Sequence, residues 1–352
     1  MKRFLIVLLL GLTLSLGFLS GASTAPEAKK EDLFKTSLHH TGRGMSYWYD
    51  KTNDGLETAT NIPYAKLACK KCHAASCEAC HKSTGKKTGP GEPKGPTSQE
   101  LCLKCHDQLA ETIKRTQTTP QEDVHFAKGM ACMDCHTQRE THGDGKPYNS
   151  LRQEGALDTR CENCHKPLKP STSHRKHGSK VHCLACHTGQ MTHQLNYQFG
   201  PLAKEGKRVA KPVSDWIFLL NFNQKLMSGK LEAFVLPGNK TYLLFYPYNS
   251  HVIAKKGHQC NDCHGSTTMK EVNKGNAIKL LPLENNQENK IPRLIPITEA
   301  LDFELNYEKF ENGKWVLLNT PEEVSTQIIR DGDYLTDKQI RKLSKPQKST
   351  KD

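Results

Sequence analysis

The arrangement of the cysteines constrains what this chain can fold into more than any other feature. All 14 cysteines of the 352 residues occur in pairs separated by two residues, and a histidine follows each pair directly. The pairs of this C-x-x-C-H pattern are Cys69 and Cys72, Cys77 and Cys80, Cys102 and Cys105, Cys132 and Cys135, Cys161 and Cys164, Cys183 and Cys186, and Cys260 and Cys263. The histidines that follow, here called the motif histidines, are His73, His81, His106, His136, His165, His187 and His264.

Three common roles of cysteine account for the thiols but not for the histidines. Disulfide bonds, which are typical of exported proteins, do not require a histidine after every second cysteine. Zinc sites built from C-x-x-C units would leave the motif histidines unexplained, and thioredoxin-like motifs lie beside a βαβ pattern that this sequence lacks. Attachment of c-type haem accounts for each whole motif, because the two thiols form thioethers with the haem and the imidazole binds its iron.

These motifs make the chain similar to the multihaem c-type cytochromes. The similarity covers roughly residues 39–264 and is specific for haem attachment, without indicating a subfamily. It implies seven covalently bound c-type haems, each held by the cysteines of one motif, with the motif histidine as the proximal ligand of the iron.

A second ligand for each iron is expected among the ten of 17 histidines that lie outside the motifs. Electron-transfer haems usually take histidine or methionine as this distal ligand. Spacing relative to the motifs favours His39, His125, His142, His174, His177, His193 and His251. His182 and His258 lie one and two residues before a cysteine and are the expected non-ligands, and His40 ranks just below His39. The alternatives at a single haem are Met130, Met133 and Met191.

The N-terminus has the form of a secretory signal peptide. Lys2 and Arg3 precede an apolar stretch over residues 4–19, and small residues follow up to Ala25. Residues 1–25 are therefore predicted to be a signal peptide cleaved after Ala22 or Ala25, with an uncleaved membrane anchor as the alternative. The mature protein is expected in the periplasm or outside the cell, without a transmembrane segment.

The distribution of the motifs predicts the fold class. Six motifs fall within residues 69–187, which leaves few side chains between them to build a conventional core. We therefore expect a mainly α-helical and irregular fold in which short helices wrap a chain of haems, with small β-hairpins in the C-terminal half. The expected parts are a six-haem domain over residues 26–195, a β-containing segment over 196–265 that ends with the seventh motif, and a haem-free segment over 266–352.

A few elements outside the motifs can also be predicted. They are β-hairpins over residues 231–248 and 303–318, and helices over residues 98–116 and 320–332. Tyr47, Trp48 and Tyr49 form an aromatic cluster that is expected to pack against haem edges, with a substrate pocket as the alternative.

Charge and motifs together favour an electron carrier rather than an enzyme. Lys and Arg exceed Asp and Glu by 13, but the propionates of seven haems would offset much of this excess, so it does not indicate nucleic-acid binding. Closely spaced haems would carry single electrons between redox partner proteins, among them other multihaem cytochromes. One alternative is a reductase of a small nitrogen or sulfur oxyanion at an open-faced haem. Another is a subunit of a conducting cytochrome filament.

Overall fold

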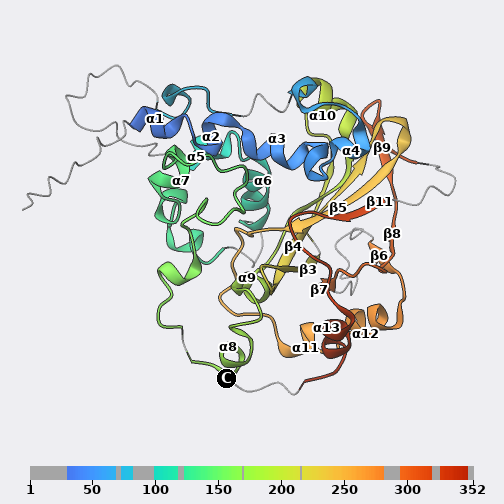
Figure 1. The fold of residues 1–352 in the computed structure, drawn as a ribbon. Helices are drawn as coiled ribbons and strands as arrows, with labels where there is room; N and C mark the ends of the chain where they lie inside the picture. The colour runs from blue at the N-terminus through green and yellow to red at the C-terminus, as the bar shows by residue number, and fades with distance from the viewer. Residues whose placement is uncertain are drawn as a thin grey trace, which may run out of the picture.

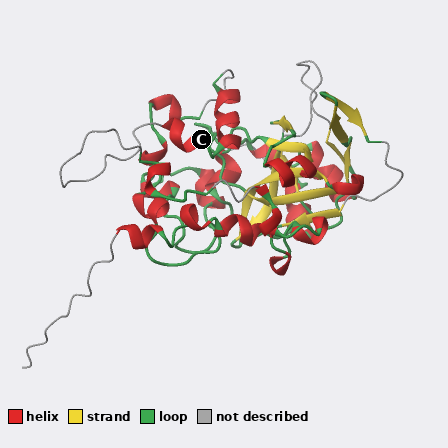
Figure 2. Ribbon diagram, turned by 90° about the horizontal axis from the view of Figure 1, so that it is seen from above, coloured by secondary structure: helices red, strands yellow, loops and turns green. Residues whose placement is uncertain are grey.

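The chain forms two regions that differ in secondary structure. The computed structural model describes residues 30–68, 73–81, 99–117, 123–168, 170–214, 216–280, 294–318 and 326–347. Short helices and turns make up the part before residue 188, and a mixed β-sheet forms most of the part that follows (Figure 1). Figure 2 shows the helical region and the sheet lying beside each other.

The helices of the first region are short. They are α1 (Lys30–Phe34), α2 (Leu38–Thr41), α3 (Arg43–Tyr49), α4 (Glu57–Thr60), α5 (Gln99–Leu103), α6 (Asp107–Thr116), α7 (Gln138–His142), α8 (Thr172–His177) and α9 (Cys183–His187). Side chains of Ser37, Thr137 and Ser171 cap the starts of α2, α7 and α8 by accepting a backbone N–H three residues on. Gly42 ends α2 with a φ of 62°, which glycine adopts without strain.

The main sheet has seven strands and mixes parallel with antiparallel pairs. Its strands are β1 (His193–Gln198), β2 (Lys211–Val213), β3 (Ile217–Phe222), β4 (Lys225–Val235), β5 (Thr241–Pro247), β7 (Leu294–Pro296) and β11 (Thr326–Ile329). The order is β11-β5-β4-β1-β2, and β3 pairs with both β4 and β7. The pairs β1–β4, β3–β7 and β5–β11 are parallel, so they join segments that are distant in the sequence.

Strand β4 is the centre of this sheet. It forms an antiparallel hairpin with β5 through a turn at Pro237–Asn239, which confirms the hairpin predicted over residues 231–248. Its other hairpin, with β3, closes through Asn223 and Gln224, whose φ values of 47° and 62° are those that a two-residue hairpin turn requires. The β3–β4 hairpin was not predicted from the sequence, because neither turn residue is glycine.

The remaining elements lie around the sheet. They are α10 (Phe199–Glu205), α11 (Cys260–Cys263), α12 (Thr267–Lys274), α13 (Asp337–Leu343), β6 (Ile278–Leu280), β8 (Phe303–Leu305), β9 (Glu308–Glu311) and β10 (Lys314–Leu317). Strand β6 pairs with β8 in parallel, and β9 with β10 in an antiparallel hairpin. Helices α11, α12 and α13 lie together at one end of the molecule (Figure 1).

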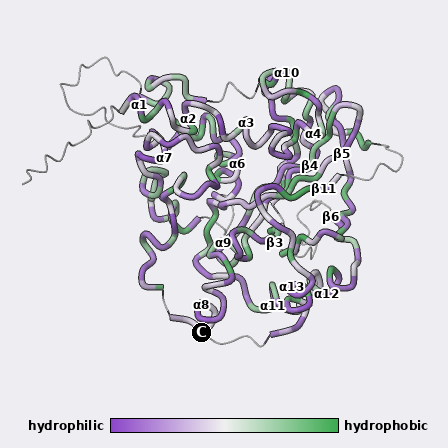
Figure 3. Tube along the Cα trace, in the orientation of Figure 1, coloured by the Kyte–Doolittle hydropathy of each residue, from purple (hydrophilic) through white to green (hydrophobic). Residues whose placement is uncertain are grey.

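Two apolar clusters pack against the sheet. The larger contains Trp216, Phe218 and Phe245, all fully buried, and includes residues of α12 and α13. The smaller joins Phe234 to residues of α3 and α10, among them Tyr49. Figure 3 shows hydrophobic residues gathered along these strands. Burial of this surface gives the sheet region a conventional hydrophobic core.

The predicted fold class is therefore wrong. The protein contains a seven-stranded mixed sheet with its own core, not a mainly helical chain wrapped around haems with minor hairpins. The error has a physical cause. Parallel partners such as β7 and β11 are three or four residues long and acquire their strand character only from long-range pairing.

Three smaller expectations have mixed outcomes. The helix predicted over residues 320–332 is wrong, because Thr326–Ile329 is strand β11; residues 319–325 lie outside the described part. The helix predicted over residues 98–116 is divided into α5 and α6 at the third motif. The hairpin predicted over residues 303–318 is confirmed for β9 and β10, whereas Phe303–Leu305 pairs with β6 instead.

The sheet draws strands from both sides of residue 265, where the sequence suggested a boundary. In the described residues, none of the helices is long and apolar enough to cross a membrane. The predicted signal peptide lies outside these residues.

The packing of Phe218 predicts a large effect on stability. Its ring lies 5.0 Å from that of Phe245 and 6.0 Å from that of Phe303, centroid to centroid, and is fully buried. Phe218→Ala should lower the free energy of unfolding by about 3–5 kcal/mol, measured by urea unfolding followed by far-ultraviolet circular dichroism. Phe310→Ala, at a ring that is 41% exposed in the β9–β10 hairpin, is the control and should cost less than about 1 kcal/mol. Equal losses would show that the sheet core does not depend on Phe218.

Candidate functional site

Each motif that the structure describes in full folds into a single helical turn. The backbone N–H of the motif histidine donates to the carbonyl of the first cysteine, at 2.7 Å for His81 and His264 and at 2.9 Å for His136 and His165. Residues at positions i, i+3 and i+4 of such a turn share one face. The two thiols and the imidazole of a motif are therefore presented together. Cys69 and Cys72 lie outside the described residues.

Six motif histidines each pair with a histidine from outside the motifs. The ring centroids in these pairs are 5.9–6.3 Å apart. The pairs are His106 with His39, His81 with His142, His165 with His125, His136 with His251, His187 with His174, and His264 with His177. All six partners are among the seven histidines that spacing favoured. Their assignments could not have been read from the sequence, because His125, just before the fourth motif, pairs with the fifth.

The structure does not pair the seventh favoured residue, His193, with a motif histidine. Its ring is fully buried in the sheet, where Nε2 donates to the Trp216 carbonyl at 2.8 Å and Nδ1 accepts the Leu231 N–H at 3.0 Å. Both ring nitrogens are engaged, so His193 serves the core rather than a metal. Burial lowers its pKa to about 3. A single sequence cannot separate this use from ligation, because both bury an imidazole beside apolar residues.

The first motif differs from the others. His73 is exposed, lies beside Gly42 and is absent from the six pairs. The next residue, Ala74, is fixed to α2, because its N–H donates to the His39 carbonyl at 2.8 Å and its carbonyl lies 3.2 Å from His40 Nδ1. This places the first motif beside the helix that supplies the partner of His106.

None of the six pairs contains His182 or His258, the two expected non-ligands. His182 caps α9, where its Nδ1 accepts the Leu184 N–H at 3.3 Å. Nδ1 of His258 lies 3.9 Å from the Asp262 carboxylate. Of the three methionines, Met191 is buried and Met133 is 40% exposed.

Hydrogen bonds to Nδ1 orient several of the paired rings. His177 Nδ1 lies 3.1 Å from the Ser173 carbonyl, and His187 Nδ1 lies 3.3 Å from the Ala254 carbonyl. His136 differs, because its Nδ1 is 2.7 Å from a carboxylate oxygen of Glu140. Oxygen acceptors at Nδ1 leave the Nε2 lone pair available for a metal.

Glu140 is a nearly buried carboxylate with several donors. Its side chain is 3% exposed, and Oε1 accepts the N–H groups of Asp158 and Thr159 at 2.5 and 2.6 Å. Burial raises the pKa of Glu140, but hydrogen bonds from Thr159, His136 and Asp158 outweigh it and hold the pKa below its ordinary value. Glu140 is therefore ionised at neutral pH.

Cysteines of successive motifs are neighbours. The Cys102 and Cys132 thiols contact each other, as do those of Cys161 and Cys183. The other adjoining motifs interact electrostatically, through Cys80 with Cys102, Cys135 with Cys164, and Cys186 with Cys263. Burial and the neighbouring Cys186 raise the pKa of Cys263 to about 12. The second to seventh motifs thus follow one another in space in their sequence order.

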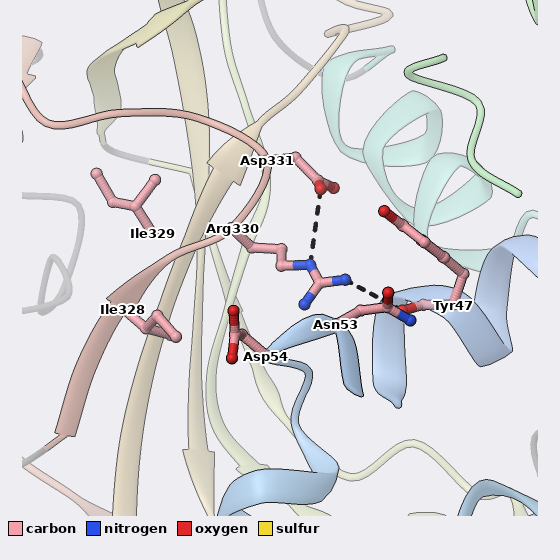
Figure 4. A pocket seen from close by; sticks show the side chains of 7 residues that line it. All are labelled: Tyr47, Asn53, Asp54, Ile328, Ile329, Arg330 and Asp331. Atoms are coloured by element: carbon pink, nitrogen blue, oxygen red, sulfur yellow. Dashed lines mark hydrogen bonds and ion pairs between the residues drawn. The ribbon is translucent and has the colours of Figure 1, made fainter. Parts of the chain in front are cut away.

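The aromatic cluster before the first motif joins α3 to the sheet. Trp48 lies edge-on to Tyr246 at 6.2 Å, and Tyr49 stacks on Phe199 at 6.0 Å, centroid to centroid. Tyr47 borders a cavity of about 290 Å³, together with Asn53, Asp54, Ile328, Ile329, Arg330 and Asp331 (Figure 4).

Figure 4 shows the Arg330 guanidinium reaching between Tyr47 and Asp331. Its Nη2 donates to the Tyr47 carbonyl at 3.0 Å, and Nε lies 3.6 Å from the Asp331 carboxylate. None of the motif histidines lines this cavity. Arg330 therefore secures α3 against β11, and the aromatic cluster serves the same junction.

No family model matches the chain, and neither a curated protein nor a solved structure matches it. Within the described residues, no group of three or more histidine, cysteine, aspartate or glutamate side chains is placed to hold a metal ion. The recurring arrangement is the pair of imidazoles beside a pair of thiols.

The buried His193 predicts a loss of stability in acid. Its folded pKa of about 3 lies below the ordinary value of 6.5, so the unfolded chain binds the extra proton between these pH values. The stabilisation is full above pH 6.5 and declines as pH falls towards 3. His193→Gln keeps a donor and an acceptor but does not titrate.

Between pH 7 and pH 5 the original protein should lose about 2 kcal/mol more unfolding free energy than His193→Gln, measured by urea unfolding at both pH values. Parallel pH dependences in the two proteins would contradict this assignment.

Proposed function

We propose that the protein is a multihaem c-type cytochrome that carries single electrons between redox partner proteins. The observation that carries the proposal is the set of six histidine pairs, each beside the two thiols of a motif. When bound, c-type haems supply one-electron transfer at iron. The chain's own residues would attach, orient and shield them.

The spacing of the rings fits ligation of one iron from both sides. A five-membered ring with bonds of about 1.33 Å places each nitrogen about 1.1 Å from the ring centre. With metal–nitrogen bonds of about 2 Å on either side, two rings in line would have centroids about 6.2 Å apart. The observed 5.9–6.3 Å agrees with this value.

Two imidazoles do not complete the coordination of a bare ion, since even zinc takes four ligands. A c-type haem would bring the remaining ligands of its iron, so the two imidazoles of each pair would be enough to hold it. The two thiols of each motif would attach the edge of the haem to the chain. The acidic and carbonyl partners of Nδ1 would fix the rings in the required tautomer.

The exposure of the thiols supports the same interpretation. Cysteine is among the residue types most often buried. Half of the twelve described cysteines are nevertheless exposed, namely Cys77, Cys80, Cys105, Cys135, Cys161 and Cys164. Thioether bonds to a large apolar group would cover them.

The serial placement of the motifs favours a carrier. Because the third and fourth motifs, and likewise the fifth and sixth, contact each other through their cysteines, haems bound there would be close enough for electrons to pass from one to the next. The partners would be redox proteins, among them other multihaem cytochromes, in the periplasm or outside the cell.

Replacing one member of a pair tests this function. Mass spectrometry of the mature protein should first show seven haem additions to the polypeptide. His251→Ala should then convert one haem from low to high spin, detected by electron paramagnetic resonance (EPR), because His136 would lose its partner at 6.2 Å. His193→Gln is the matched control, since it also removes a histidine outside the motifs but should leave every haem low-spin. Four or fewer haem additions, or no high-spin signal in His251→Ala, would refute the proposal.

A second candidate function follows from the first motif. His73 is absent from the six pairs, and His40 lies beside the next residue, Ala74. A haem bound at His73 without a second imidazole would have an open face, which is what reduction of a small nitrogen or sulfur oxyanion requires.

Carbon monoxide binding distinguishes this candidate. We expect the reduced protein to bind carbon monoxide at one haem of the seven, seen as a partial shift of the Soret band, because six irons would be closed by paired histidines. Cys69→Ala combined with Cys72→Ala should abolish the shift, whereas Cys77→Ala with Cys80→Ala should not. A protein that binds no carbon monoxide would leave only the carrier function.

A further inference from the structure

Among the described motif histidines, His136 alone has a carboxylate oxygen within hydrogen-bond distance of Nδ1. Glu140 lies four residues after His136, on α7, and one of its oxygens is 2.7 Å from His136 Nδ1. An ionised carboxylate can only accept, so the proton lies on Nδ1 and the Nε2 lone pair is left for the metal. The carboxylate cannot turn away, because its other oxygen accepts the N–H groups of Asp158 and Thr159.

Two of the other paired rings have neutral partners, whereas Nδ1 of His125 lies 3.4 Å from the Asp123 carboxylate. Backbone carbonyls of Ser173 and Ala254 lie at Nδ1 of His177 and His187, at 3.1 and 3.3 Å. The bond to Glu140 is shorter, and a charged acceptor makes a hydrogen bond about twice as strong as a neutral one. His136 should therefore be a more electron-rich ligand than His177 or His187.

The negative charge of Glu140 is not neutralised by the neighbouring cation. The adjacent cation, Arg139, instead pairs with Asp158 at 2.5 Å and with Asp144 at 3.0 Å. In the described residues, no Lys or Arg side chain forms an ion pair with Glu140. A buried, uncompensated carboxylate stabilises the more positive state of a nearby centre.

We propose that Glu140 is a positioning residue that lowers the reduction potential of the haem ligated by His136 and His251, relative to the pairs held by backbone carbonyls. The inference rests on the proposed function, because it needs a haem at this pair. Through its hydrogen bond and its charge, Glu140 favours iron(III) over iron(II) at the fourth motif. That haem would hold its electron less tightly than the haems whose histidines bond to backbone carbonyls.

The test is a redox titration of haem-loaded protein monitored by EPR. The signal of this haem is identified as the low-spin component lost in His251→Ala. Glu140→Gln should raise the midpoint potential of the haem held by His136 and His251. The expected rise corresponds to at least a tenfold change in the equilibrium constant of reduction, which is about 59 mV for one electron. The other midpoints should shift less.

Two further variants separate this role from a structural one. Asp134→Asn removes a carboxylate of the fourth motif that accepts the Ala131 N–H at 2.7 Å and does not bond to His136. It should change the equilibrium constant of reduction of this haem by less than about threefold. Thr159→Val removes a hydroxyl that lies 3.1 Å from Glu140 Oε2 and 2.8 Å from the Cys135 carbonyl, two acceptors that share its one proton. It should lower the midpoint, because the carboxylate then bonds to His136 with less competition.

The possible failures can be told apart. Absence of haem by mass spectrometry would refute the proposed function. Seven haems with an unchanged midpoint in Glu140→Gln, or a midpoint raised by Thr159→Val, would overturn the role of Glu140 and leave the carrier function intact.

Discussion

The helical region depends on pairs of imidazole rings held about 6 Å apart. Its helices are too short to persist alone, because isolated helices of fewer than about 12 residues are marginal in water. Most pairs join segments that are far apart in the chain, as when α2 supplies the partner of His106 and the segment after β5 supplies the partner of His136. A metal centre between the rings would act as a cross-link, so cofactor binding and folding would be coupled in this region.

The sheet region provides a frame that does not depend on these pairs. Its backbone holds the sixth motif directly, through the Gly189 N–H to the Val252 carbonyl at 2.8 Å and the Ala254 N–H to the His187 carbonyl at 2.7 Å. The same segment, between β5 and the seventh motif, carries His251. The segment after β5 therefore carries His251 and, through these bonds, positions the motif histidine His187.

A buried polar cluster joins the third motif to the same frame. Lys230 and Glu232 lie on β4 with almost no exposure, and Lys230 Nζ donates to the Gln108 side chain on α6. The Tyr246 hydroxyl donates to Glu232 at 2.9 Å. Buried charges cost free energy unless they are fully hydrogen-bonded, so such a cluster specifies one orientation of α6 and hence of the adjacent His106.

The sequence alone determined the chemistry that a local pattern can encode. The spacing C-x-x-C-H fits a single helical turn, so it groups two thiols and an imidazole wherever the turn lies, and the offsets of His125, His142 and His251 marked them as ligand candidates. Tertiary structure alone decided which histidine meets which, that His193 belongs to the core, and that Glu140 reaches His136. It also decided the seven-stranded sheet, because short strands such as β7 and β11 are specified by partners more than 70 residues away. Contacts of that range depend on the packing of the whole chain, which no local pattern of residues contains.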